Sequence, residues 1–171
     1  FSVHALTNGA KEVTSLDIFR VLPFGGSVFK VKLKGSLLKK VLDYGCGTGI
    51  LAILAEKIGA THIDALDIDP AATENATENT KLNNSNHINI HQGTLNTIKE
   101  KNYDVILANI NRNVIIESLP TLHQHLKTDG TLVISGILTR DRALVEAHLE
   151  ECNFKIKEVT SRGGWVCLVV T

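Results

Sequence analysis

The chain has 171 residues, of which 43% are hydrophobic and 21% charged, so it is long enough to bury one sizeable core and has the composition of a globular domain. Its 18 Lys and Arg residues balance 18 Asp and Glu residues, so no overall charge draws it to nucleic acid or to an anionic membrane. The three cysteines form no C-x-x-C pair, which argues against a disulfide framework or a zinc site and favours a reducing compartment, with the cytoplasm as the expected location.

The beginning of the chain predicts neither a membrane anchor nor a secretion signal. No apolar run approaches the ~20 residues that span a bilayer, and the first residues lack the charged, apolar and cleavage regions of a signal peptide. The sequence starts with Phe rather than Met. We therefore interpret it as a fragment of a longer protein.

Residues 1–18 resemble a part of the chain that lies further on. Shifted by 50 positions, "LDI" at residues 16–18 matches "LDI" at residues 66–68, which predicts a helix followed by an acidic strand end at Asp17. The remnant of a tandem domain, a chimeric join and a chance match all stay open as explanations. Residues 21–36 predict a turn, a strand and a linker.

From residue 40 onward, strand and helix patterns alternate. The first strands and helices are predicted at residues 40–44, 50–59 and 62–68, with Asp69 and Pro70 as the N-cap and first residue of a second helix. Further strands are predicted at residues 87–92, 103–110 and 130–138, and further helices at residues 113–126 and 143–153. Residues 154–161 and 165–171 predict an antiparallel pair that turns at two glycines. This order predicts an α/β fold: a doubly wound, mostly parallel seven-stranded sheet with an antiparallel C-terminal strand pair.

The loop between the first strand and helix of this region is rich in glycine. Gly45, Gly47 and Gly49 form G-x-G-x-G rather than the dinucleotide fingerprint G-x-G-x-x-G, and Asp43 precedes them. An acid at this place repels a diphosphate and favours a positively charged ligand. Asp67, 24 positions later, ends the next strand, where an acid accepts hydrogen bonds from ribose hydroxyls. A ligand with a ribose, a cation and no phosphate indicates S-adenosylmethionine.

The sequences "VLDYGCGTG" and "ALDIDP" resemble motif I and the following acidic motif of class I S-adenosylmethionine-dependent methyltransferases. The resemblance implies a Rossmann-like fold and S-adenosylmethionine as the cofactor, with S-adenosylhomocysteine as its product and no metal. It also implies that the cofactor is contacted by residues of the glycine loop and of the following strand ends, namely Asp43, Gly45, Cys46, Gly47, Thr48, Gly49, Asp67, Ile68, Gly93 and Asn109. For Cys46, a role as small loop filler is favoured over a nucleophile, because the sequence suggests no nearby base.

Three further stretches narrow the resemblance. "YDVILANINRNVI", "GTLVISGIL" and "GGWVCLVV" are similar to enzymes that methylate large-subunit ribosomal protein eleven on amino groups. The resemblance covers residues 37–171 and implies that this part is the catalytic domain, with methyl transfer to lysine side chains and an N-terminal amine. The implied partner is the ribosomal protein, with neither membrane nor direct nucleic-acid binding. The recognition domain of that family is not recognisable in residues 1–36.

Asn109 is the candidate catalytic residue. It ends a predicted strand where doubly wound sheets open their ligand crevice, and its carboxamide is suited to accept a hydrogen bond from an incoming amine, with help from the carbonyls of Asn109 and Ile110. The alternative is that Asn109 only terminates the strand. One of the polar residues Asn111, Arg112 and Asn113 is expected to cap the next helix, and for Asn113 this role is favoured over catalysis.

Two other functions stay open. An RNA methyltransferase is suggested by residues 1–18, which also resemble RNA cytosine methyltransferases, but "NINR" at residues 109–112 lacks the aromatic ring that stacks on a flipped base, and the net charge is zero. The second alternative is a cofactor-binding module that is inactive without its substrate domain.

Overall fold

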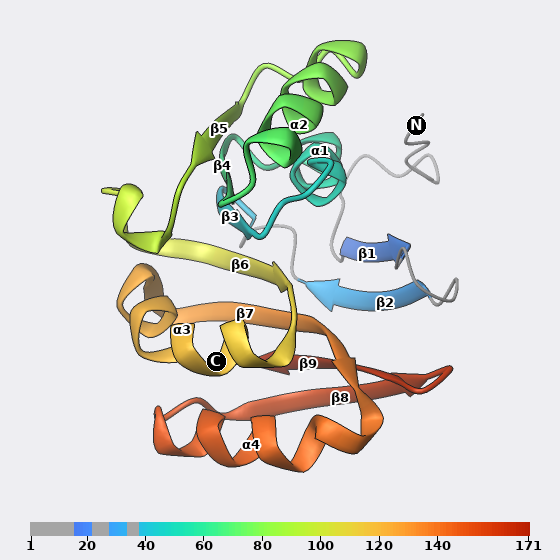
Figure 1. The fold of residues 1–171 in the computed structure, drawn as a ribbon, viewed down its shortest axis with the longest axis vertical. Helices are drawn as coiled ribbons and strands as arrows, with labels where there is room; N and C mark the ends of the chain where they lie inside the picture. Colours follow the sequence, from blue (N-terminus) through green and yellow to red (C-terminus); the bar gives the residue numbers. More distant parts are fainter. Residues whose placement is uncertain (1–15, 22–27, 34–37) are drawn as a thin grey trace.

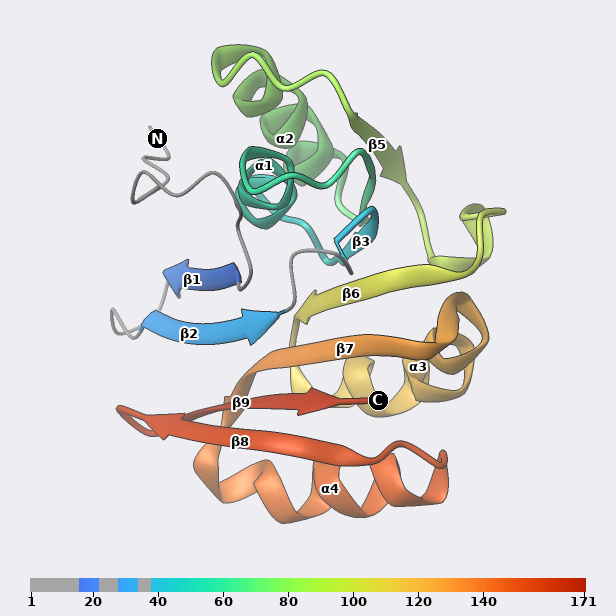
Figure 2. The same ribbon diagram turned by 180° about the vertical axis from the view of Figure 1, so that it is seen from behind.

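The computed structural model describes residues 16–21, 28–33 and 38–171 (Figures 1 and 2). Seven strands form one sheet in the order β5-β4-β3-β6-β7-β9-β8. Their bounds are β3 (Lys40–Tyr44), β4 (His62–Asp67), β5 (Ile88–Gln92), β6 (Tyr103–Asn109), β7 (Leu126–Leu138), β8 (Ile156–Arg162) and β9 (Trp165–Val170). The strands from β5 to β7 are parallel, and β9 runs antiparallel to both β7 and β8. The predicted fold class is confirmed.

Helices cover both faces of this sheet, and their bounds are α1 (Ile50–Lys57), α2 (Pro70–Leu82), α3 (Arg112–His125) and α4 (Arg142–Glu151). On one face of the sheet, a buried cluster joins α1 and α2 to every second residue of the strands. On the other face, a second buried cluster joins α3 and α4 to the intervening strand residues. Figures 1 and 2 show α3 and α4 together on one face. The alternation arises because successive residues of a strand point to opposite faces. Among the residues with described positions, no helix is long and apolar enough to cross a membrane.

The connections β5–β6 and β7–α4 each contain a short 3-10 turn, η2 (Leu95–Thr97) and η3 (Thr139–Asp141). Two irregularities lie in β7. Its N-terminal part begins four residues before the predicted position, because Leu126 pairs with Tyr103 across a register shift. Its C-terminal part holds a bulge against β9, where the pairing passes from Ile134–Leu168 to Ile137–Val166. The extra residue of this bulge lies at Ser135 and Gly136.

The two strands before the main sheet form a unit of their own. β1 (Leu16–Val21) and β2 (Val28–Leu33) pair antiparallel in a two-stranded sheet, and β2 lies within the range that predicts a strand. The predicted acidic strand end at Asp17 is wrong, because β1 begins at Leu16 and continues beyond Asp17 to Val21. The helix predicted before it, and the end of residues 21–36 where a linker is predicted, lie outside the described residues. The division into residues 1–36 and 37–171 stays a prediction.

Candidate functional site

The glycine loop joins the end of β3 to the start of α1 and is held against β4. The amides of Gly45 and Cys46 both donate to the carbonyl oxygen of Leu66, at 2.8 and 3.0 Å. Gly45, Gly47 and Gly49 have φ angles of 72°, 54° and 75°, a left-handed conformation that glycine adopts without strain. A Cβ at Gly47 would meet no atom within 4 Å, so the backbone there is open to a close ligand.

Asp43 stabilises the connection between this loop and α1 from within the protein core. Its side chain is completely buried, and its Oδ2 accepts a hydrogen bond from the amide of Ala52, at 3.0 Å, in the first turn of α1. The carboxylate therefore satisfies an amide that has no partner within the helix. Asp43 lies at the fourth position of β3, beneath the glycines rather than among them.

The end of β4 meets the glycine loop through Asp67. Its Oδ2 accepts from the amide of Gly47 at 2.9 Å, and its Oδ1 accepts from the amide of Asp69 at 3.0 Å. Gly93, just after β5, donates its amide to the Asp67 carbonyl at 2.9 Å. Ile68 is 71% exposed beside this carboxylate. The structure thus brings the predicted residues of three neighbouring segments to one edge of the sheet.

Helix α2 fixes the far side of the loop. Asn79 donates from its carboxamide to the Thr48 carbonyl at 2.9 Å. A Cβ at Gly49 would lie 3.1 Å from the Cβ of Ala76, so the loop and the helix approach closely at that point. Neither Asn79 nor Ala76 was predicted, because their sequence neighbourhood reads as an ordinary polar helix.

Cys46 has no nucleophilic character. Its side chain is 5% exposed, and burial, together with the nearby charges of Asp43 and Asp67, raises the pKa of its thiol far above the ordinary range. A thiol that stays protonated does not act as a nucleophile. This agrees with the predicted role of Cys46 as a small residue that fills the loop.

Asn109 is the last residue of β6 and lies beside the bulge of β7. Ser135 donates from Oγ to Asn109 Oδ1 at 3.4 Å, a long hydrogen bond. A Cβ on Gly136 would lie 2.7 Å from Asn109 Oδ1, so this glycine packs directly against the carboxamide. Residues 135 and 136 were not predicted as part of the site, although an isolated glycine within a strand indicates a bulge or a close approach.

The start of α3 is capped by one of the polar residues that follow β6, as predicted. Asn111 is the N-cap, because its Oδ1 accepts from the amide of Val114 at 3.1 Å, whereas Asn113 lies within the helix. Arg112 in the first turn of α3 pairs with Asp141 at 2.6 Å and so ties this turn to η3. Asp141 stands at the N-cap of α4 but makes no capping bond there. Its carboxylate therefore holds together the two loops that follow β6 and β7.

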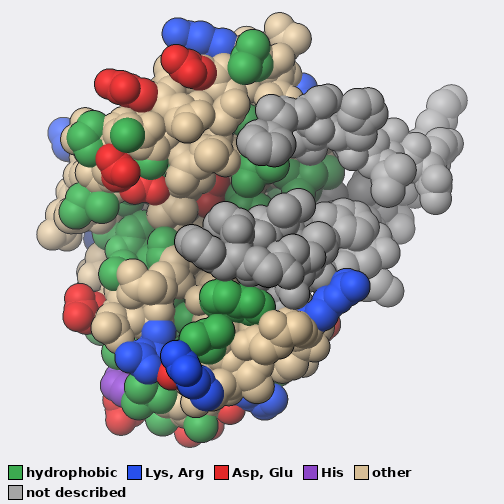
Figure 3. Space-filling model, turned by 45° about the vertical axis from the view of Figure 1, so that its right-hand side comes forward, with side chains coloured by type: hydrophobic (Ala, Val, Ile, Leu, Met, Phe, Trp, Pro, Cys, Tyr) green, Lys and Arg blue, Asp and Glu red, His purple; other side chains and the backbone are tan. Residues whose placement is uncertain are grey.

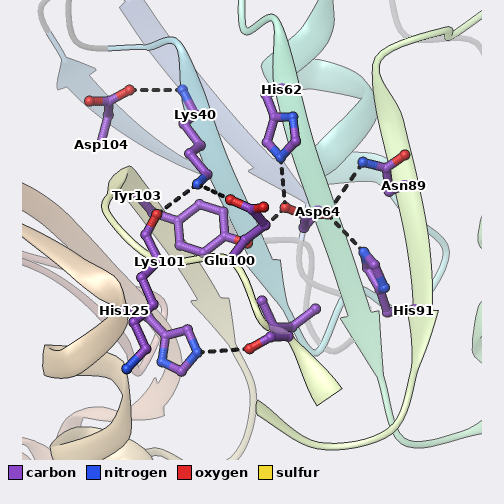
Figure 4. A network of polar contacts seen from close by, with 11 residues as sticks. Lys40, His62, Asp64, Asn89, His91, Glu100, Lys101, Tyr103, Asp104 and His125 are labelled. Carbon is purple, nitrogen blue, oxygen red and sulfur yellow. Dashed lines mark hydrogen bonds and ion pairs between the residues drawn. The ribbon is translucent and has the colours of Figure 1, made fainter. Parts of the chain in front are cut away.

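A second group of polar residues, centred on Asp64, was not predicted from the sequence. It lies on the opposite face of the sheet from Asp43. Figure 4 shows four side chains converging on Asp64. Tyr103 Oη donates to its carboxylate at 2.7 Å, His91 Nε2 lies 2.8 Å away and His62 Nε2 lies 3.1 Å away, with Asn89 at 3.4 Å. Lys40 Nζ lies 5.0 Å from the centre of the Tyr103 ring. This Asp64 network fills the sheet face where η2, rather than a helix, joins β5 to β6.

The Asp64 network is expected to stabilise the fold in a pH-dependent way. Burial raises the pKa of the Asp64 carboxyl, but the hydrogen bonds from Tyr103 and His91 and the charges of His62 and His91 outweigh it and lower the pKa overall. A lowered pKa stabilises the fold at pH values above the unfolded pKa of about 4, and this contribution is lost as the pH falls through the lower folded value.

We therefore expect Asp64→Asn to reduce the free energy of unfolding by about 1–3 kcal/mol at pH 7, because a buried hydroxyl loses its charged acceptor. The difference from the unmodified chain is expected to shrink as the pH falls below about 4. Urea unfolding at several pH values measures it, and the exposed Asp129 provides Asp129→Asn as the control, with a change within about 0.5 kcal/mol. Equal stability of both variants at every pH would contradict this role.

One face of the surface is seen in the space-filling view (Figure 3). Acidic and basic side chains both occur on the face in Figure 3, and hydrophobic side chains gather near its middle. Among the residues that the structure describes, no group of His, Cys, Asp and Glu has the arrangement of a metal site.

Comparison with known proteins gives the following matches. A family model described as ribosomal protein L11 methyltransferase matches residues 30–171. Proteins named ribosomal protein L11 methyltransferase are similar in sequence: that of Acetivibrio thermocellus is 38% identical over 134 residues, and that of Lactobacillus gasseri is 41% identical over 130 residues. These matches cover 77% and 76% of this chain, but 42% and 41% of the relatives. The chain thus spans less than half the length of these relatives.

A solved structure extends this likeness to three dimensions. The crystal structure of ribosomal protein L11 methylase from Lactobacillus delbrueckii subsp. bulgaricus superimposes with a TM-score of 0.74 at 34% sequence identity. The superposition covers 77% of this chain and 68% of that one.

Proposed function

Because the chain belongs to the ribosomal protein L11 methyltransferase family, we propose that it carries the site that transfers methyl groups from S-adenosylmethionine to amino groups of ribosomal protein L11. The observation that carries this proposal is the meeting of the glycine loop, Asp67 and Asn109 at one edge of the sheet. Lysine side chains and an N-terminal amine are the proposed acceptors, and the cytoplasm, where ribosomal proteins are made, is the proposed location.

The residues at this edge fit the cofactor. The open backbone at Gly47 accommodates a close ligand, and the partly exposed Asp67 carboxylate is already aligned by two amides. We propose that Asp67 accepts hydrogen bonds from the ribose hydroxyls and that the exposed Ile68 and the neighbouring Gly93 border the adenine. Asp43, from beneath, holds the loop and α1 in place and contributes a negative charge. Cys46, Thr48 and Gly49 complete the proposed contacts.

In the proposed reaction, the main task of the chain is to align the acceptor amine with the methyl group. The bound cofactor supplies an electrophilic methyl carbon on a positively charged sulfur. Asn109 Oδ1 and the carbonyl oxygen of Ile110 hold the N–H groups of a neutral amine, so that its lone pair faces this carbon. Transfer of this methyl group to the amine nitrogen would leave the electrons of the broken bond on sulfur, and the methylated amine would release its proton to water. The pair Arg112–Asp141 keeps the loops around Asn109 together.

The test has one binding arm and two activity arms. Titration calorimetry measures S-adenosylmethionine binding by the 171-residue chain, and transfer of a labelled methyl group is followed on purified ribosomal protein L11 and on ribosomal RNA. We expect binding, and transfer to the protein alone. Transfer to RNA alone would replace this proposal with the RNA methyltransferase alternative. Binding without transfer to either acceptor would support the cofactor-binding module.

We expect the 171-residue chain to methylate ribosomal protein L11 more slowly than a full-length relative does. The chain spans less than half of the relatives' length, and binding energy from remote contacts helps to align the acceptor.

Asp67→Ala is expected to weaken S-adenosylmethionine binding by about 1–3 kcal/mol, because the ribose hydroxyls lose their acceptor and the Gly47 amide loses its own. The matched control is Asp69→Ala, two residues on. Asp69 caps α2 through the amide of Ala71 at 2.9 Å, so this change lowers stability but leaves affinity unchanged. Equal dissociation constants for the Asp67 variant and the unmodified chain would rule out the ribose contact.

A further inference from the structure

The bulge in β7 brings an unusual backbone position to the acceptor side of the site. Gly136 has a φ angle of 80°, in the left-handed region that favours glycine, and it is partly exposed. It follows Ser135, which pairs with Asn109 in the parallel β6–β7 ladder. Bulges reorient side chains and occur often beside active sites.

Two oxygen atoms pack against this glycine. A Cβ at Gly136 would lie 2.7 Å from Asn109 Oδ1 and 3.2 Å from the carbonyl oxygen of Ile110. Both oxygens can only accept hydrogen bonds. They therefore pack against this glycine at distances that a residue with a side chain does not allow.

From this geometry we propose that Ser135 and Gly136 are positioning residues that select an amine with two N–H donors as the methyl acceptor. Ser135 Oγ holds Asn109 Oδ1 from one side, and bare Gly136 lets this oxygen and the Ile110 carbonyl oxygen both lie close to its backbone, an arrangement from which each oxygen would receive one N–H. An amine nitrogen is thereby oriented at two points, which fixes the direction of its lone pair. This inference rests on the proposed methyl-transfer function and deepens it, because it assigns the selection of the acceptor to β7.

Steric contact, not backbone strain alone, is what a side chain at residue 136 adds. A methyl group there overlaps the Asn109 carboxamide and forces it away from its position. A displacement of about 1 Å at a reacting group is enough to cost about 100-fold in rate. The cofactor loop follows β3 rather than β7, so cofactor affinity is expected to stay unchanged.

The chain contains a closely matched control for the strain. Gly164 in the β8–β9 turn has a φ angle of 82°, against 80° at Gly136, but a Cβ there would meet no atom within 4 Å. Gly164→Ala thus reproduces the backbone strain of Gly136→Ala without the contact. We expect Gly136→Ala to lower the single-turnover rate on ribosomal protein L11 by about 10- to 100-fold, with the same S-adenosylmethionine dissociation constant, and Gly164→Ala to leave both unchanged.

A second readout does not need turnover. The side-chain amide signal of Asn109 in a ¹⁵N nuclear magnetic resonance spectrum is expected to shift in Gly136→Ala and to stay in place in Gly164→Ala. If Gly136→Ala does not fold, Ser135→Ala carries the test, with a shifted Asn109 signal and a slower rate at unchanged cofactor affinity. Equal rates and unshifted signals in the folded variants would overturn this inference. An unmodified chain that binds cofactor but methylates nothing would instead count against the proposed function.

Discussion

Gly45→Ala is expected to lower the free energy of unfolding by about 2–5 kcal/mol and to weaken cofactor binding. The left-handed φ of 72° costs an alanine about 1–2 kcal/mol. A Cβ would also lie only 2.0 Å from Ile110 Cγ2, and such overpacking adds about 1–3 kcal/mol. The branched Ile110 side chain has few alternative rotamers, so the strain passes into the backbone next to Asn109.

Gly47→Ala separates the two costs. Gly47 lies in the same loop with a φ of 54°, but a Cβ there would meet no atom within 4 Å. Only the backbone cost of about 1–2 kcal/mol is expected at this position. Urea unfolding of both variants measures the difference. Equal losses would mean that the contact between Gly45 and Ile110 contributes nothing to stability.

Asn109→Ala is expected to reduce the rate of methyl transfer by about 100-fold, because under the proposed function the acceptor amine loses one of the two oxygens that orient it. The S-adenosylmethionine dissociation constant is expected to stay within about twofold if alignment, rather than cofactor contact, is the main role of this side chain. Single-turnover transfer and calorimetry on the same preparation measure the two quantities.

The control for this change is Asn113→Ala. Asn113 is exposed in the first turn of α3, and its Oδ1 accepts a hydrogen bond from its neighbour Arg112 at 3.1 Å. The control is expected to transfer methyl groups at the unmodified rate. If Asn109→Ala matches it, Asn109 only terminates β6. If Asn109→Ala loses cofactor affinity and rate in equal measure, its main contact is with the cofactor.

The sequence predicts the order of strands and helices well because each depends on local periodicity. The run at residues 40–44 and the alternation at 62–68 become β3 and β4 almost without change. The first and last residues of strands and helices are less well predicted where they depend on contacts with other residues. β7 begins at Leu126 because that residue pairs with Tyr103, and α3 begins after Asn111 because that side chain reaches the Val114 amide.

The candidate site is predicted in part for the same reason. Glycine spacing and acidic strand ends are local signals, and the structure brings Gly47, Asp67 and Gly93 together. The Asp64 network gives no such signal, because Asp64 lies in a strand of alternating pattern and its partners His91 and Tyr103 are 27 and 39 residues away. The contact between Gly136 and Asn109 likewise exists only once β6 and β7 are paired.

The protonated state of Cys46 has a practical consequence for labelling the protein. Alkylating reagents and oxidants react with the thiolate, so Cys46 resists both, and Cys167 is buried as well. Cys152, which is partly exposed at the end of α4, is therefore the thiol that a fluorescent maleimide reaches in the folded chain. Helix α4 starts at η3 beside the acceptor loops and extends its 10 residues away from them. At 1.5 Å per residue this places a dye about 15 Å from the start of the helix. A dye at Cys152 therefore labels the folded chain without occupying the proposed site.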